Sequence, residues 1–258
     1  MFRLIQEIHR NRELIWTLAL KELRVRYKRS ALGFLWSLLN PLMMMIVLTV
    51  VFSHIMRVAV AAYPVFLISM LLPWTFFAQV LAYSAESIVG NGELLKKVRI
   101  TKSVFPLAAV LANLINFLLS LAPLLLLLVV LRFPLHATWL YLPVPMLGLA
   151  MFSLGCAFFV AAANVFFRDV AHILQIVISA WFYLSPIIYS VDMVPARFRF
   201  FFHLNPLVYV LNGFRLSIYY GLLPSAASAA MSIGIGLTVL VLGYAFFRRL
   251  EDSFVFYI

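Results

Sequence analysis

The feature that most constrains this chain is a series of long apolar runs, several of which exceed 20 residues. At 1.5 Å per helical residue, about 20 residues cross the hydrocarbon core of a bilayer. With 65% hydrophobic and only 11% charged residues, the chain has too few polar groups to cover a water-soluble fold. The runs also lack the alternation of barrel strands. The sequence therefore predicts an all-α integral membrane protein with six spans, at about residues 32–52, 63–88, 104–131, 139–165, 170–189 and 225–247.

The Lys and Arg residues are spread unevenly over the segments that flank these runs. Fifteen of the 20 lie in residues 1–30 and 90–103, at position 168 and at positions 248 and 249, whereas five lie in the other connections. Because basic residues accumulate in cytosolic segments, this asymmetry predicts that both termini are cytosolic. The net charge of +11 is explained by this orientation signal, so we expect no nucleic-acid partner.

Residues 1–30 are expected to form a cytosolic amphipathic helix in the plane of the membrane surface, ahead of the transmembrane domain 31–258. Trp16, Leu20, Leu23 and Tyr27 are spaced to share one helical face. Cations on its flanks are expected to meet the headgroups of membrane lipids. Two compatible roles remain open, a membrane anchor and a docking element for a cytosolic partner. The residues assigned to this helix are Trp16, Lys21, Arg24, Arg26 and Lys28.

The hydrophilic loop 90–103, with sequence GNGELLKKVRITKS, carries four cations and is expected to be cytosolic. Leu94, Leu95 and Val98 could share the apolar face of a short helix within it. The loop is then either a solvated segment that sets the topology or a short helix presented to another protein.

Three prolines interrupt the stretch from Asn164 to Pro206. Asp169 is expected to be the N-cap of the span 170–189, and Arg168 is expected to reach lipid phosphates. Beyond Pro186 the segment 191–223 is too polar for a simple span and too apolar for a solvated loop. Short interfacial or re-entrant helices fit this pattern, provided that protein or a water-filled cavity satisfies the backbone where it bends.

Motifs for bond-breaking chemistry are absent from the sequence. It contains no G-x-x-x-x-G-K-[ST] loop for ATP, no HExxH metal site and no G-x-S-x-G nucleophile. Cys156 is the single cysteine, which excludes a disulfide framework. We therefore expect no catalytic residue, bound metal or cofactor in this chain. An intramembrane transferase remains as an alternative, with Asp192 and His203 as its only outer acid–base candidates.

Aromatic residues are abundant, with 24 Phe, 11 Tyr and 5 Trp. They gather at residues 74–77, 181–183 and 198–202. Most of them are explained by an interfacial aromatic belt and by lipid-facing rings. The alternative is a conduit whose rings stack on sugar faces.

Four stretches are similar to a known family. They are LKELRVRYKRSALGFLWSLLNPL (20–42), LLPWTFFAQ (71–79), NVFFRDVAHILQ with LSPIIYSVDMVP (164–175 and 184–195) and NPLVYVLNGFR (205–215). On these residues the chain resembles the permease subunits of ABC-2-type exporters, in the branch that exports lipid-linked O-antigen, teichoic acid and related polysaccharides. A second possibility within the same fold is the export of a small drug or lipid.

The resemblance implies a homodimer that works with two cytosolic ABC ATPase subunits, which bind ATP and Mg²⁺, in the bacterial cytoplasmic membrane. It implies that the ATPase contacts a coupling helix made of Glu93, Leu94, Leu95, Lys97, Val98 and Arg99. It also implies two short re-entrant outer helices between the fifth and sixth spans. The conduit would lie between the protomers, lined mainly by the first and fifth spans, with the re-entrant hairpin gating its outer mouth. The residues assigned to the conduit and its gate are Phe34, Ser37, Asn40, Trp74, Phe77, Trp181, Tyr183, Pro186 and Tyr189.

Overall fold

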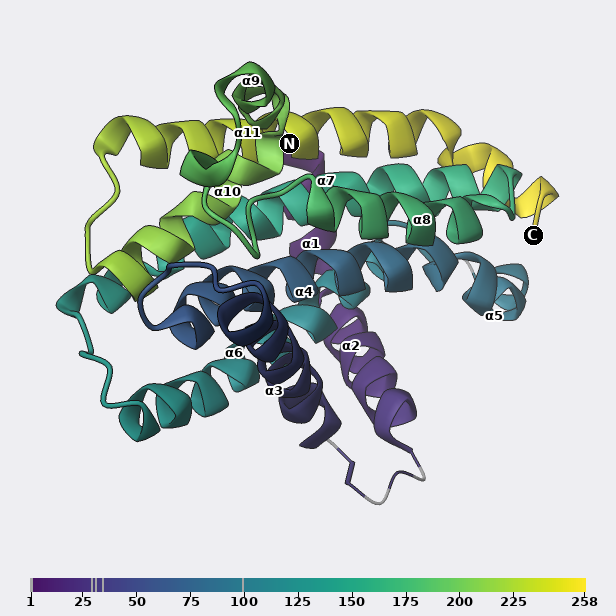
Figure 1. Cartoon of the computed structure of the whole chain (residues 1–258). Helices are drawn as coiled ribbons and strands as arrows, with labels where there is room; N and C mark the ends of the chain where they lie inside the picture. Colours follow the sequence, from purple (N-terminus) through teal and green to yellow (C-terminus); the bar gives the residue numbers. More distant parts are fainter. Residues whose placement is uncertain (1, 29, 31, 34, 99) are drawn as a thin grey trace.

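The structure is a computed structural model that describes residues 2–28, 30, 32–33, 35–98 and 100–258. This part of the chain is helical and contains no strand. In Figure 1 four long helices form the body of the molecule: α4 (Tyr63–Ser87), α6 (Val104–Val130), α7 (Pro143–Phe166) and α11 (Ala226–Leu250). In α4, 78% of the apolar stretch is buried, compared with 33% to 50% in the other three helices. Helix α4 therefore lies at the centre of the bundle.

These four helices are long and apolar enough to cross a membrane, counting the short helical turns η3 (Ala137–Tyr141) before α7 and η6 (Glu251–Phe256) after α11. They coincide with the expected spans 63–88, 104–131, 139–165 and 225–247. An apolar helix pairs all of its backbone groups internally, which is the condition for crossing hydrocarbon. The long apolar runs therefore translate directly into long helices.

The other two expected spans are shorter helices. The first is α3 (Leu35–Thr49), which continues as the π-helical turn η1 (Val50–Ile55). The fifth is α8 (Val170–Tyr183), whose 14 residues cover about 21 Å, less than the hydrocarbon thickness of about 30 Å. The expectation that this helix continues to residue 189 is wrong, because it ends at Tyr183. Pro186 lacks a backbone N–H and restricts the residue before it, so the helix ends and residues 184–189 form a turn.

The N-terminal segment forms two helices, where one was expected. Helix α1 (Phe2–Arg10) and helix α2 (Arg12–Tyr27) are separated at Asn11. The face of α2 that packs on α6 contains the buried Ile15 and Ala19, one position away from the face that was predicted around Trp16. Trp16 itself is 50% exposed. Glu22 and Arg26 extend the packed face as an ion pair, which the apolar periodicity could not indicate.

Helices α7 and α11 pack closely along a row of small residues. A Cβ on Gly236 would lie 2.5 Å from the carbonyl oxygen of Gly148, and one on Gly243 would collide with the backbone of Gly155. A Cβ on Gly148 would likewise meet Ser232. Small residues therefore let the two backbones approach closely, which is typical of membrane helices.

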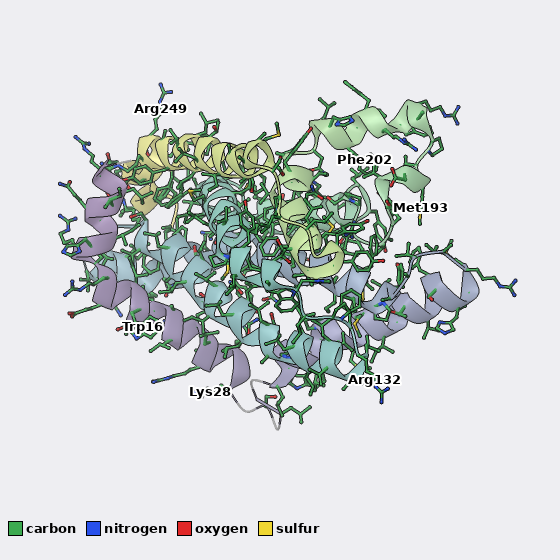
Figure 2. All side chains as sticks on the ribbon, turned by 90° about the vertical axis from the view of Figure 1, so that its left-hand side faces the viewer. Trp16, Lys28, Arg132, Met193, Phe202 and Arg249 are labelled. Atoms are coloured by element: carbon green, nitrogen blue, oxygen red, sulfur yellow. The ribbon has the colours of Figure 1, made fainter. Side chains whose placement is uncertain are left out.

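The remaining elements gather at two opposite ends of the bundle. At the end that we call the C-terminal end, α1, η2 (Val89–Asn91), α5 (Gly92–Lys97), the α7–α8 turn and η6 meet. At the other end, the hairpin end, lie η3, the turn 184–189, η4 (Val191–Met193), α9 (Ala196–Leu204), α10 (Pro206–Arg215) and η5 (Leu216–Tyr220). Figure 2 shows Met193 and Phe202 on the side opposite to Trp16 and Arg249.

Candidate functional site

An aromatic pocket of about 580 Å³ lies at the hairpin end, between the end of α8 and helix α9. Its size falls within the range of small-molecule sites, about 300 to 1,000 Å³. Half of its lining residues are aromatic. It is lined by Trp181, Leu184, Tyr189, Val194, Phe198, Phe201, Phe202, Leu204, Asn205 and Pro206.

Asn205 organises the polar side of this pocket. Its side-chain oxygen accepts hydrogen bonds from Trp181 Nε1, at 3.0 Å, and from the backbone N–H of Leu207, at 3.1 Å. The second bond caps the N-terminus of α10, as an Asn at this position commonly does. Its amide nitrogen donates to Ser185 Oγ at 3.0 Å. One side chain therefore fixes the indole, the turn after α8 and the start of α10.

Arg215 is buried, 5% exposed, directly beneath the turn 184–189. Its guanidinium donates to the carbonyl oxygens of Pro186, at 2.7 Å, and Ile187, at 2.8 Å. Tyr63 donates to the next carbonyl, that of Ile188, at 2.7 Å. The guanidinium also lies 3.8 Å from the ring centre of Phe66, which is a cation–π geometry. Side chains from α4 and α10 thus replace the helical hydrogen bonds that the broken helix has lost.

Five of the nine residues assigned to the conduit either line the aromatic pocket or are buried in the chain. Trp181 and Tyr189 line the aromatic pocket, whereas Pro186 is buried in the turn. Trp74 and Phe77 are 5% and 0% exposed within one chain, with the Phe77 ring 5.3 Å from Trp181. These two rings support the pocket wall and line no surface of the single chain.

Two further residues of the conduit set lie on exposed helix faces. Tyr183 on α8 is 62% exposed, and Asn40 on α3 is exposed. Phe34 lies outside the described residues, and the side chain of Ser37 is not described. Both helices also expose large apolar side chains, namely Leu35, Trp36, Met43, Met44, Ile46 and Val47 on α3 and Ile173, Ile176 and Val177 on α8. Figure 1 shows α3 leaning away from α7 and α11.

The expected coupling segment forms the short helix α5 at the C-terminal end. Glu93 and Lys97 are exposed and 3.9 Å apart. Leu94 and Leu95 are half-buried and pack against the core, so the apolar face of α5 points inward. Val98 follows the helix and is 50% exposed. Arg99 lies outside the described residues.

The cations of α2 divide into exposed and packed groups. Arg24 and Lys28 are exposed, and Lys21 Nζ lies 3.4 Å from Asn91 Oδ1 beside the coupling segment. Arg26 pairs with Glu22 at 3.0 Å and donates to Asn113 Oδ1 at 3.1 Å. Burial raises the pKa of Glu22, and the nearby Arg26 opposes that shift. Arg26 therefore joins α2 to α6 and is not free to meet lipid.

Arg168 and Asp169, at the start of α8, make contacts other than the expected lipid contact and helix cap. Asp169 holds the N-cap position, but its side chain makes no capping hydrogen bond. Asn164 Oδ1 accepts from the backbone N–H of Ala171 instead, at 3.1 Å. Arg168 donates to the carbonyl oxygen of Tyr257 at 3.2 Å. Arg168 therefore contacts the C-terminal segment of the same chain.

Three residues whose side chains hold the two ends of α8 by hydrogen bonds were not among the candidates. They are Asn164, Asn205 and Arg215. The last two lie in the stretch NPLVYVLNGFR. An Asn-Pro pair is a known helix start, so a cap at Asn205 could have been found from sequence. Nothing in the sequence marks Arg215 as buried.

The described residues are helical, and four of their helices are long and apolar enough to cross a membrane, which is the pattern of a multi-pass membrane protein. The comparisons define the family: the sequence matches the ABC-2 type transporter family over residues 13–219, and the chain belongs to that family. It is therefore a multi-pass inner-membrane protein and a permease subunit of an ABC transporter, not itself an enzyme.

Full-length relatives carry more specific names. The chain is 33% identical to the O-antigen export system permease protein RfbA of Myxococcus xanthus, over 98% of both chains. It is 31% identical to the RfbA permease of Klebsiella pneumoniae, over 94% of this chain and 93% of the relative. It is 24% identical to the polysialic acid transport protein KpsM of Escherichia coli, over 92% and 93%.

Proposed function

We propose that this chain is the membrane-spanning subunit of an ATP-driven exporter that moves a lipid-linked polysaccharide across the inner membrane. The names of the relatives support this substrate class, since two export O-antigen and one transports polysialic acid. Their similarity extends over nearly the whole chain, so it includes the hairpin end as well as the long helices.

The observation that carries the proposal is the aromatic pocket at the hairpin end. Aromatic rings stack on the apolar faces of sugars, and fixed polar groups at the rim can bind their hydroxyls. Here Trp181 and Asn205 are held by hydrogen bonds, while Phe198 and Phe201 on α9 remain 43% and 62% exposed. A repeating polymer requires weak, repeated contacts of this kind, because tight binding would stop its passage.

The exposed apolar faces of α3 and α8 support a homodimer. Symmetric pairing of two copies would cover both faces and place Asn40 and Tyr183 along the seam. Each chain would then contribute half of a conduit, with α9 and α10 as re-entrant helices at its outer mouth. The shorter helices α3 and α8 would complete six spans, with both termini in the cytosol.

The energy source in this proposal is a pair of cytosolic ABC ATPases that bind ATP and Mg²⁺. Helix α5 and the N-terminal helices lie at the same end of the bundle, which supports docking of the ATPases at that end. Closure of the ATPases on ATP would move this end, and α3 and α8 would transmit the movement to the conduit.

Replacing Phe201 by alanine is expected to lower polymer export about three- to tenfold, the effect of losing one aromatic contact. Phe200 is the matched control. It lies on the same helix and is also 62% exposed, but it does not line the pocket. The measurement is ATP-dependent transport of the polymer by the reconstituted permease and ATPase. Equal transport by the Phe201→Ala and Phe200→Ala variants would contradict a role for the pocket.

Replacing Val98 by aspartate tests the coupling surface. Because Val98 is half-exposed beyond the end of α5, the change should leave the fold intact, whereas a charge at Leu94 would also disturb the core. We expect about tenfold weaker association with the ATPase, as for loss of an apolar contact at an interface. Co-purification of the ATPase with tagged permease measures this. Undiminished association together with normal transport would refute the assignment.

A further inference from the structure

The last eight residues of the chain, Glu251–Ile258, are held firmly at the C-terminal end of the bundle. Phe254 is completely buried, with its ring 5.2 Å from Phe247 and 5.9 Å from Phe166. The side chain of Glu251 pairs with Arg248, and its carbonyl oxygen accepts from Lys102 Nζ. A segment with these contacts is an ordered part of the fold, not a frayed terminus.

This segment also joins the two loops of the C-terminal end. Tyr257 stacks edge-on with Phe166, at 4.7 Å, and its carbonyl oxygen accepts from Arg168 in the α7–α8 turn. The Cγ2 methyl of Ile258 occupies the space that any side chain at Gly92 would need, at the start of α5. The segment therefore spans from the α7–α8 turn to Gly92, the first residue of α5, directly before the expected coupling residues.

Its outer side presents an apolar tip. Phe256 is 86% exposed and Val255 is 49% exposed, although the neighbouring Phe254 is buried. Asp252 on the same segment is exposed, and so are Glu93 and Lys97 on the adjoining helix α5. An aromatic centre with a charged rim is typical of protein–protein interfaces.

We propose that Val255 and Phe256 form a second contact for the ATPase partner, continuous with the coupling helix. This inference rests on the proposed function and deepens it by naming a further part of the docking surface. Because Ile258 lies against Gly92, an ATPase bound to α5 borders the tip. Movement of the ATPase then acts on α5 and on the α7–α8 turn together through this segment.

The test uses the full permease–ATPase complex in detergent and measures the affinity of the ATPase for the immobilised permease. Phe256→Asp is expected to weaken binding about tenfold or more, the size of an aromatic interface contact. Phe256→Leu keeps an apolar tip and is expected to retain most of the affinity. Val255→Asp provides a second substitution at the tip. Thermal unfolding of each variant alone should match the parent, since surface changes away from packed groups are nearly neutral.

Val98→Asp in the same assay separates this inference from the proposed function. If Val98→Asp weakens binding while Phe256→Asp and Val255→Asp bind like the parent, the tip is not a contact and the proposed function stands. If no variant weakens binding, the docking surface itself is misplaced. If Phe256→Asp and Val255→Asp keep full affinity, and a cysteine at position 256 of the assembled complex is shielded from an aqueous thiol reagent in lipid vesicles but not in detergent, the tip lies in the membrane surface and the inference is overturned.

Discussion

Replacing Gly243 by alanine is expected to destabilise the protein by about 3 kcal/mol, at the upper end of the usual cost of overpacking. The new methyl group would collide with the carbonyl oxygen and carbon of Gly155. These are backbone atoms, so no side-chain rotation can relieve the contact and α7 and α11 must move apart. Thermal unfolding in detergent should show a loss of roughly 10 °C in the midpoint, given the usual relation between free energy and midpoint at this size.

Gly234 provides the matched control on the same helix. A Cβ at that position has no atom within 4 Å. Gly234→Ala should therefore be neutral or slightly stabilising, because alanine is favoured over glycine inside a helix by up to about 1 kcal/mol. Similar unfolding midpoints for Gly243→Ala and Gly234→Ala would show that the backbones of α7 and α11 are not in contact in the folded protein.

Replacing Arg215 by methionine is expected to cost about 2 to 5 kcal/mol, because two buried carbonyl groups lose their donor at about 1 to 3 kcal/mol each. Exchanging a buried charge for an apolar residue is often harmless when its partners are exchanged too. Here the partners are the main-chain carbonyls of Pro186 and Ile187, which remain buried without a donor. Thermal unfolding measures the cost. A cysteine placed at Ser185, which is buried in the parent, should become reactive to a thiol reagent as the turn opens.

Arg215→Lys separates charge from geometry at the same site. Lysine keeps the positive charge but lacks the planar fork that serves two carbonyl groups at once. Its stability and the reactivity at residue 185 are expected to lie between those of the parent and of Arg215→Met. A methionine variant as stable as the parent, with an unreactive cysteine, would show that the guanidinium does not hold the turn.

The long helices were predictable because their cause is local. Residues 63–88 and 104–131 are continuous apolar runs, and in hydrocarbon such a run can satisfy its backbone only as a helix. The small residues at the α7–α11 contact were predictable for the same reason, since their size is visible in the sequence. The prolines indicated where the fifth span would break, although not that the helix would end as early as Tyr183.

Long-range partners could not be read from the sequence. Arg215 counted as an ordinary cation of an outer connection, because nothing local shows that it reaches carbonyl groups 28 and 29 residues earlier. Asp169 had the right residue type for a cap, but Asn164 provides the hydrogen bond from the preceding helix. The position of Trp16 predicted one apolar face of α2. The face that packs on α6 is instead the neighbouring one, which contains Ile15 and Ala19. In each case tertiary contacts decided between locally equivalent choices.

The side chains that donate hydrogen bonds to the carbonyl groups of the turn 184–189 constrain the order in which the chain can fold. Asn205 and Arg215 are synthesised after the carbonyl groups that they bind, whereas Tyr63 is already in place. Until residues 205–215 have been synthesised, the carbonyl oxygens of Leu184, Pro186 and Ile187 lack these donors, which would be costly in hydrocarbon. The turn that follows α8 therefore gains its full set of hydrogen bonds only once α10 has formed and packed against it. A nascent chain that stops before residue 205 should accordingly leave α8 at the membrane surface or in the translocation channel.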